Sequence, residues 1–312
     1  MDGEDNITNP LASPRFCGLR SFMRLPHHRR AEADIMLVGA PFDTGASFRV
    51  GARFAPQAIR QASVLLRPYH PQHQLNIFSR LSGADYGDIN VVPGNIQASY
   101  QRITSELLTL LKQGVIPVVM GGDHSITLPV LRAIKEVHGS VALLQFDAHS
   151  DTWDRPYGEL YSHSTPILRA IEEELILPHR SIQVGIRGSA NSAEELEIPG
   201  AKGLRVVTIT RAREQGVESL LEEINQRLAG ERVYLTFDID AVDPAYAPGT
   251  GTPEVGGFTS FQIQQLLRGL AGNNFVGSDL VEVLPAYDCS EVTALLAANI
   301  IHEFLALLAL NA

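Results

Sequence analysis

Cysteine is scarce in this chain, whose 312 residues include only Cys17 and Cys289. Two cysteines are too few for a disulfide framework, and neither belongs to a metal-binding cysteine pair, so they favour a reducing, cytoplasmic setting. The sequence also shows no apolar run long enough to span a bilayer and no basic opening followed by an apolar core. We therefore expect a soluble, unexported protein with no membrane partner.

Positive charge is also in short supply, because 25 Lys and Arg face 35 Asp and Glu, a formal net charge of −10. Binding to phosphate backbones needs a clustered excess of Lys and Arg, so we expect no nucleic-acid partner. The same balance favours a small cationic substrate. No linker divides the chain. We expect an irregular N-terminal arm at residues 1–33 and a single domain at residues 34–312.

Short apolar runs alternate with segments of helical period along this domain. Such alternation predicts an α/β fold with a mostly parallel sheet covered on both faces. The predicted strands are 34–40, 115–120, 140–146, 181–186, 204–209, 232–237 and 274–283. The predicted helices are 55–66, 96–112, 126–137, 164–175, 216–228, 260–270 and 290–310.

The segment 146–153, FDAHSDTW, follows one predicted strand and places Asp147, His149 and Asp151 at alternate positions. In a strand every second side chain points to the same face, so these three start out on one side. A fully extended run from residue 147 to 151 would span roughly 13 Å, which is too long for a compact metal site. We therefore expect the chain to bend here and to form a metal site at the strand end.

Two more predicted strands end in the same way. Asp238 and Asp240 follow one of them, and Asp123 and His124 follow another after two glycines. Sites in open α/β sheets form at the carboxyl ends of the strands, so these segments are expected to converge on one crevice. Asp123 is interpreted as a residue that orients a ligand or the loop backbone.

Four carboxylates in one crevice cannot all remain ionised without compensating charge, because neighbouring like charges raise each other's pKa. No lysine cluster is near these motifs. Two divalent cations would cancel four negative charges, and four acids with two imidazoles provide enough ligands for a bridged pair. The oxygen-rich set favours manganese, while the imidazoles leave nickel, iron and zinc open. Such a pair makes hydroxide available near neutral pH, which predicts hydrolysis at a cationic or neutral carbon centre.

Three ordered segments resemble the signatures of the ureohydrolase family, which includes arginases and agmatinases. They are 121–125 (GGDHS), 146–151 (FDAHSD) and 237–244 (FDIDAVDP), the last followed by APGTGTP at 247–253. The likeness runs from about residue 22 through the last helix and is greatest to agmatinases and guanidino-acid hydrolases. It implies a three-layer αβα fold of the arginase and deacetylase type, with residues 34–312 as the catalytic domain. It also implies two divalent ions, Mn²⁺ first and Ni²⁺ as the alternative, and a homo-oligomer, a hexamer or trimer.

The resemblance also implies a role for each candidate residue. His163 matches the histidine that shuttles a proton, and Glu282 matches the acid that grips a guanidinium. Both roles are chemically reasonable, since a departing amine needs a proton and a carboxylate can make paired hydrogen bonds to a guanidinium. The metal ligands carried over are His124 on one ion, His149 on the other, Asp147, Asp151 and Asp238 shared or bridging, and Asp240 on the second ion.

The implied reaction is cleavage of a small guanidino compound to urea and an amine by a metal-bridging hydroxide. Agmatine, guanidinobutyrate and guanidinopropionate are the candidate substrates, and free guanidine or another substituted guanidine, with nickel, is the alternative. A zinc deacylase and a non-catalytic partner subunit are weaker alternatives. Ser164 stands where relatives usually have glycine. Arg187 and Arg24 either meet a substrate carboxylate or have a structural role, and Trp153 is placed either in a pocket wall or in the core.

Overall fold

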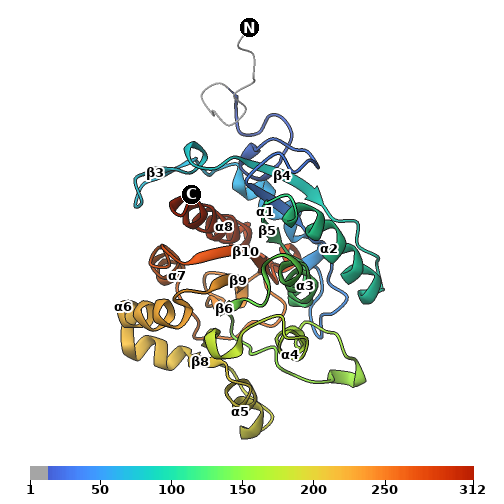
Figure 1. Ribbon diagram of the computed structural model, residues 1–312, viewed down its shortest axis with the longest axis vertical. Coiled ribbons are helices and arrows are strands. Elements are labelled where there is room, and N and C mark those ends of the chain that lie inside the picture. The colour runs from blue at the N-terminus through green and yellow to red at the C-terminus, as the bar shows by residue number, and fades with distance from the viewer. Residues whose placement is uncertain (1–12) are drawn as a thin grey trace.

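The computed structural model describes residues 13–312, and its centre is one parallel sheet (Figure 1). Every strand pairing in this sheet is parallel. Three of its strands are buried along their whole length, which explains why they read as mostly apolar runs rather than alternating ones. The strand order is β4 (Gly83–Asp88), β1 (Ile35–Gly39), β5 (Ile116–Met120), β10 (Asn274–Val281), β9 (Arg232–Asp238), β6 (Ala142–Phe146), β7 (Ile182–Ile186) and β8 (Arg205–Thr208).

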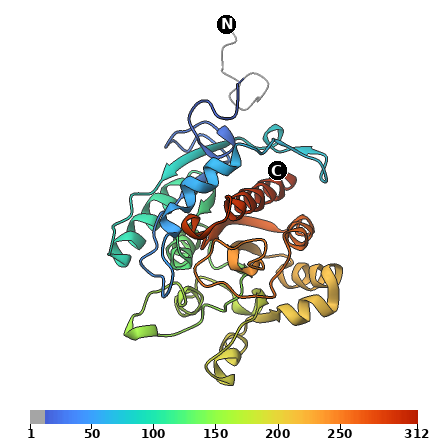
Figure 2. The same ribbon diagram turned by 180° about the vertical axis from the view of Figure 1, so that it is seen from behind.

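Different helices cover the two faces of the sheet. Figure 1 shows this arrangement from the front of the molecule and Figure 2 shows it from behind. Along β1, Ile35 and Leu37 pack into one apolar cluster, whereas Met36 and Val38 pack into the other. The first cluster contains α1 (Ala55–Ser63), α6 (Ile209–Leu228), α7 (Ser260–Arg268) and α8 (Val292–Leu310). The second contains α2 (Ile96–Leu111), α3 (Thr127–His138) and α4 (Pro166–Glu172). The predicted three-layer αβα fold is confirmed.

All fourteen predicted strands and helices are present, but residues 13–312 contain three further strands and one further α-helix that were not predicted. Strand β4 escaped because its sequence GADYGD is polar and rich in glycine, as suits an edge strand. A hairpin of β2 (Tyr69–His70) and β3 (Leu75–Asn76) has strands too short for a periodic signal. The last is α5 (Ala193–Ala201), which contains Pro199 and buries little else.

Helix α8 corrects one expectation from the sequence. By length and composition alone it is apolar enough to cross a membrane, so the prediction that no run reaches that length was wrong. Most of the helix is buried in the described structure, with 78% of its most apolar window inside the fold. Burial of most of its surface between α1, α7 and the sheet accounts for its apolarity.

Part of the predicted N-terminal arm belongs to the core. Phe22 and Met23 are buried, and their backbone N–H groups donate to Asp85 and Ser63 at 2.7 and 2.8 Å. These contacts attach the segment to α1 and β4. Residues 1–12 of the arm lie outside the described part of the chain, and its boundary at residue 33 remains a prediction.

Candidate metal centre and active site

The candidate site lies where four neighbouring strands, β5, β10, β9 and β6, reach their carboxyl ends. The chain must turn sharply at each end. At Gly122, after β5, a Cβ atom would lie 1.6 Å from the carbonyl oxygen of Phe42, so only glycine fits. Asp151 and Glu282 adopt left-handed backbone angles, with φ of 52° and 62°. Such conformations are uncommon outside glycine and concentrate at functional sites.

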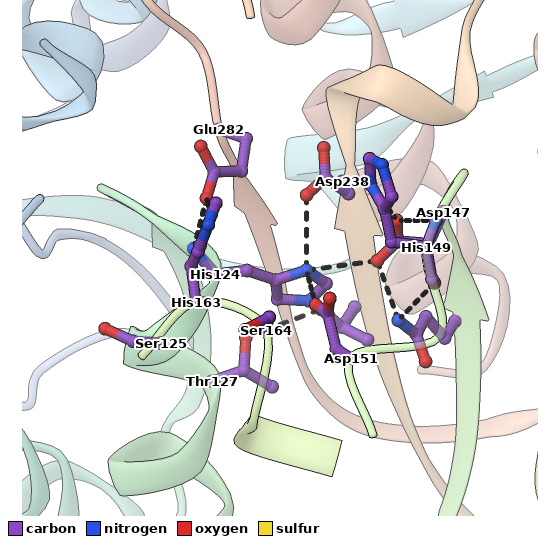
Figure 3. Close-up of polar contacts among 12 residues, drawn as sticks. His124, Ser125, Thr127, Asp147, His149, Asp151, His163, Ser164, Asp238 and Glu282 are labelled. Carbon is purple, nitrogen blue, oxygen red and sulfur yellow. Dashed lines mark hydrogen bonds and ion pairs between the residues drawn. The ribbon is translucent and has the colours of Figure 1, made fainter. Parts of the chain in front are cut away.

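The first group of predicted ligands surrounds one ring nitrogen (Figure 3). The Nδ1 atom of His124 lies 2.8 Å from Asp151 Oδ2, 3.1 Å from Asp147 Oδ2 and 3.2 Å from Asp238 Oδ2. This nitrogen is buried and makes no hydrogen bond of acceptable geometry. Three carboxylate oxygens and one imidazole nitrogen therefore face a common point, which is the donor set of a divalent metal ion.

The second group shares Asp147 with the first. His149 Nδ1 lies 2.9 Å from Asp240 Oδ2 and 3.6 Å from Asp147 Oδ1. Asp240 Oδ2 is buried without a hydrogen-bond partner, while its other oxygen accepts from the backbone N–H of Ala148 at 3.0 Å. The six predicted ligands thus form two adjacent clusters, and the residues fit a pair of divalent ions.

The pKa shifts of the clustered residues also indicate that the site needs positive charge. Burial raises the pKa of the Asp238 carboxyl well above its usual range, and neighbouring Asp240 raises it further. Burial also raises the pKa of Asp151, to about 6. Burial lowers the pKa of His149, but the charges and hydrogen bonds of Asp240 and Asp147 together outweigh it and raise the pKa to about 12. Without cations the site thus favours protons on both imidazoles and raises the pKa of Asp151, Asp238 and Asp240, and divalent ions would supply the same neutralising charge.

A buried polar network fixes the orientation of His124 from behind. Its Nε2 lies 2.9 Å from the hydroxyl of Thr236, which donates to Asp279 at 2.6 Å. Asp279 also accepts from Tyr234 and Thr127. Because Nε2–H donates to Thr236, Nδ1 is the ring nitrogen that faces the carboxylates and that would give up its proton to a bound metal ion. The sequence reasoning missed this network, although a buried Asp inside an apolar strand was a visible signal.

His163 and Glu282 lie beside the first cluster, as Figure 3 shows. His163 Nδ1 is 3.0 Å from Glu282 Oε1, which also accepts from the backbone N–H of His124 at 2.9 Å. Burial lowers the pKa of His163, but the hydrogen bond and charge of Glu282, with the charges of Asp123 and Asp151, together outweigh it and raise the pKa to about 9. The second carboxylate oxygen of Glu282 is buried without a partner. The structure thus brings together all eight predicted residues.

Ser47 was not predicted as a site residue. Its hydroxyl and its backbone N–H lie 2.7 and 3.1 Å from Nε2 of His163. The loop that carries Ser47 is tied down by Asp123, which accepts from the backbone N–H of Gly45 at 2.7 Å. This contact agrees with the predicted role of Asp123 in orienting loop backbone. Only the fold brings Ser47 and His163 together, so no local pattern could have revealed the pair.

A cleft of about 380 Å³ opens from these residues to solvent. Trp153 lines it with 39% of its surface exposed, so it is a wall residue and not a core residue. Ser164 also lines the cleft, with its hydroxyl 2.9 Å from that of Ser162. Its φ is not positive, so serine replaces the family glycine without backbone strain.

The sequence left Arg187 and Arg24 open between a contact with a substrate carboxylate and a structural role, and the hydrogen bonds of both favour the structural role. Arg187 lines the cleft, but its guanidinium donates to backbone carbonyls, including those of Asp240 at 2.6 Å and Glu254 at 2.7 Å. Arg24 is buried at the N-terminal segment and donates to Ser13. A guanidinium has only five N–H donors, and Arg187 directs its donors at loop carbonyls.

The parallel three-layer fold and the strand-end clusters define a ureohydrolase. A family model, Arginase family, matches residues 33–307, and the chain belongs to this family. It is 42% identical to a guanidinobutyrase of Pseudomonas aeruginosa over 98% of each chain. It is 44% identical to a mitochondrial agmatinase of Gallus gallus over 93% of this chain and 86% of the relative.

Solved structures agree with this assignment. The proclavaminate amidino hydrolase of Streptomyces clavuligerus superposes with a TM-score of 0.91 and 40% sequence identity, covering 96% of this chain and 100% of the other. The predicted family and reaction class are confirmed. The chain is a hydrolase of amidine C–N bonds that converts a guanidino compound to urea and an amine.

Proposed function

We propose that the protein releases urea from a small guanidino compound with two divalent ions held by the six clustered ligands. One ion would lie between His124 and its three carboxylates, and the other between His149, Asp147 and Asp240. The observation that carries this proposal is the convergence of three carboxylate oxygens within 3.2 Å of the unpartnered Nδ1 of His124. When bound, such ions supply an activated water near neutral pH.

The oxygen-rich ligand set supports Mn²⁺ as the resident metal. Carboxylates outnumber imidazoles by four to two among the proposed ligands, and hard oxygen donors suit manganese better than zinc. Nickel is the alternative because both imidazoles can serve it. Asp147 belongs to both clusters, so we assign it as the residue that couples the two ions.

Glu282 and His163 would act on the substrate itself. The unpartnered Oε2 of Glu282 is the acceptor available to a guanidinium N–H, since Oε1 already accepts from His124 and contacts His163. A buried carboxylate holds a cation strongly because little water competes for it. His163, bound to the same carboxylate, is placed to give a proton to the departing amine nitrogen, which must leave neutral.

The names of the relatives support a range of substrates that differ in the tail attached to the guanidino group. Guanidinobutyrate carries a carboxylate tail and agmatine carries an ammonium, and both remain candidates, as does guanidinopropionate. Free guanidine, with no tail, is the alternative. All of them share the planar cation that Glu282 would hold.

Urea release measured over this panel, with Mn²⁺ or Ni²⁺ and with metal content determined on the same sample, tests the proposal. We expect urea from at least one compound and two ions per chain. Asp147→Asn should abolish urea release and lower metal content, because it alters both clusters. Asp154→Asn removes an acid whose side chain is 67% exposed and should change neither. Urea from none of the compounds, or one tightly held zinc per chain, would refute the proposal.

We also propose that the protein works in the cytoplasm as a homo-oligomer, a trimer or hexamer. The two cysteines are free and exposed, which is compatible with a reducing compartment. Light scattering on the purified protein would give the oligomeric state, and fractionation of cells would give the location.

A further inference from the structure

The outer end of the cleft is where a substrate tail would lie. The inner end contains His124, Asp151, His163 and Asp238, which would hold the metal and the guanidino group. The size of the cleft is typical of a small-molecule site and exceeds what a guanidinium alone would fill. We call the solvent-facing lining the outer cleft; it consists of Trp153, Tyr157, Asn191, Glu195, Leu196 and Glu254.

Among residues 13–312, the outer cleft offers no cation to pair with a carboxylate tail. Arg187 is the only Arg or Lys in the lining. Its guanidinium donates hydrogen bonds to the loop carbonyls of Asp240, Glu254 and Val255. Arg155 lies next door, in a separate shallow hollow that shares Trp153 and Glu195 with the cleft. A tail would have to leave the cleft to reach it.

The outer cleft does offer negative charge. Glu195 is oriented by Asn191, whose backbone N–H and side-chain amide donate to its Oε2 at 2.8 and 3.0 Å. Neither Glu195 nor Glu254 forms an ion pair with any residue the structure describes. The rings of Trp153 and Tyr157 add negative π faces, which attract cations. The charge of Arg187 offsets part of that of Glu254, but the two carboxylates outnumber this one guanidinium, so the charges and the rings both favour a cationic tail.

We propose that the outer cleft selects guanidino compounds whose tail ends in an ammonium over those whose tail ends in a carboxylate, with Glu195 and Glu254 as the residues that read the tail. This inference rests on the proposed function, because it takes the guanidino group to lie at the inner end. A unit charge about 4 Å from one carboxylate changes binding by about fivefold in water, and more in a partly dry cleft. Two carboxylates should therefore give a preference of about tenfold or more.

Two substrates of similar length test the proposal, agmatine with an ammonium and 4-guanidinobutyrate with a carboxylate. We expect the metal-loaded protein to have a kcat/KM for agmatine at least about tenfold higher. Glu254→Gln and Glu195→Gln should each lower this ratio by about fivefold. Glu218→Gln is the matched control. Glu218 is exposed on α6 and does not line the cleft, so this variant should leave the ratio unchanged. Added salt should lower the ratio as well.

Three results would overturn the proposal. The first is a preference for guanidinobutyrate, and the second is a ratio that neither glutamine variant changes. The third is a selective loss of guanidinobutyrate turnover in Arg155→Gln, which would place tail recognition in the adjoining hollow. If neither compound is turned over, titration calorimetry of both with the metal-loaded protein still measures the tail preference as binding. A preference for agmatine binding with no urea release would therefore count against the proposed function and not against the tail inference.

Discussion

Replacing Thr236 by valine tests how the fold prepares His124 to bind metal. The substitution conserves shape but removes the hydroxyl that lies 2.9 Å from His124 Nε2 and donates to Asp279 at 2.6 Å. Thr236, His124 and Asp279 are all buried, so no water can replace the lost partner without a rearrangement. The imidazole then loses the acceptor that keeps the proton on Nε2 and leaves Nδ1 free.

Two effects of known size should follow. Loss of a partner that orients a metal-binding histidine typically weakens metal affinity by about 10- to 100-fold. Separately, the metal-free protein should lose about 1–3 kcal/mol of unfolding free energy, because a buried N–H and a buried carboxylate each lose a hydrogen bond. The metal affinity is the sharper test, since many core substitutions lower stability.

Mn²⁺ affinity would be measured by competition with a chelator, and stability by urea denaturation of the metal-free protein. Thr127→Val is the matched control, because Thr127 also donates to Asp279, at 2.8 Å, but makes no hydrogen bond to His124. Both variants should lose stability, while only Thr236→Val should lose metal affinity by tenfold or more. Equal metal affinity in the two variants would refute the reasoning that the His124 hydrogen bond prepares the site.

Three further predictions concern the proton shuttle and the stability of the fold. Glu282→Gln should lower kcat/KM by about 100-fold or more, because a buried charged hydrogen bond to the substrate is lost. Its metal content should be unchanged, and loss of metal would contradict the role assigned to Glu282. Ser47→Ala should lower kcat about tenfold with little change in KM, because it removes the hydroxyl 2.7 Å from His163 Nε2. Ser47→Thr, which keeps a hydroxyl, should restore activity. An unchanged kcat in Ser47→Ala would rule out a role for Ser47 in positioning His163. Burial lowers the pKa values of His73 and His302 in the folded protein. As the pH falls below about 6.5, these two histidines therefore bind more protons in the unfolded chain than in the folded one. The stability that these neutral histidines provide should be complete above that pH and decline below it in thermal melts, and His302→Asn should weaken this decline.

The strands were predictable because burial on both faces leaves a local record in the sequence. Residues 115–120 are apolar without interruption and residues 140–146 are mostly apolar, as a parallel strand covered on both faces requires. Strand β4 leaves no such record because it lies at the edge, where polar residues and glycine are tolerated. Helix α8 misled in the opposite direction, since a core helix and a membrane span share the same composition.

The sequence by itself determined the ligand types, because Asp147, His149 and Asp151 alternate at the end of a strand and local geometry puts them on one side. It also determined the family, through three ordered motifs. Tertiary structure alone decided which groups remain free to act. It placed Ser47 against His163, connected Asp279 to His124 through Thr236, and closed loop carbonyls around Arg187. These outcomes depend on contacts between distant strands and loops, and hydrogen-bond partners separated by tens of residues leave no periodic pattern in a single sequence.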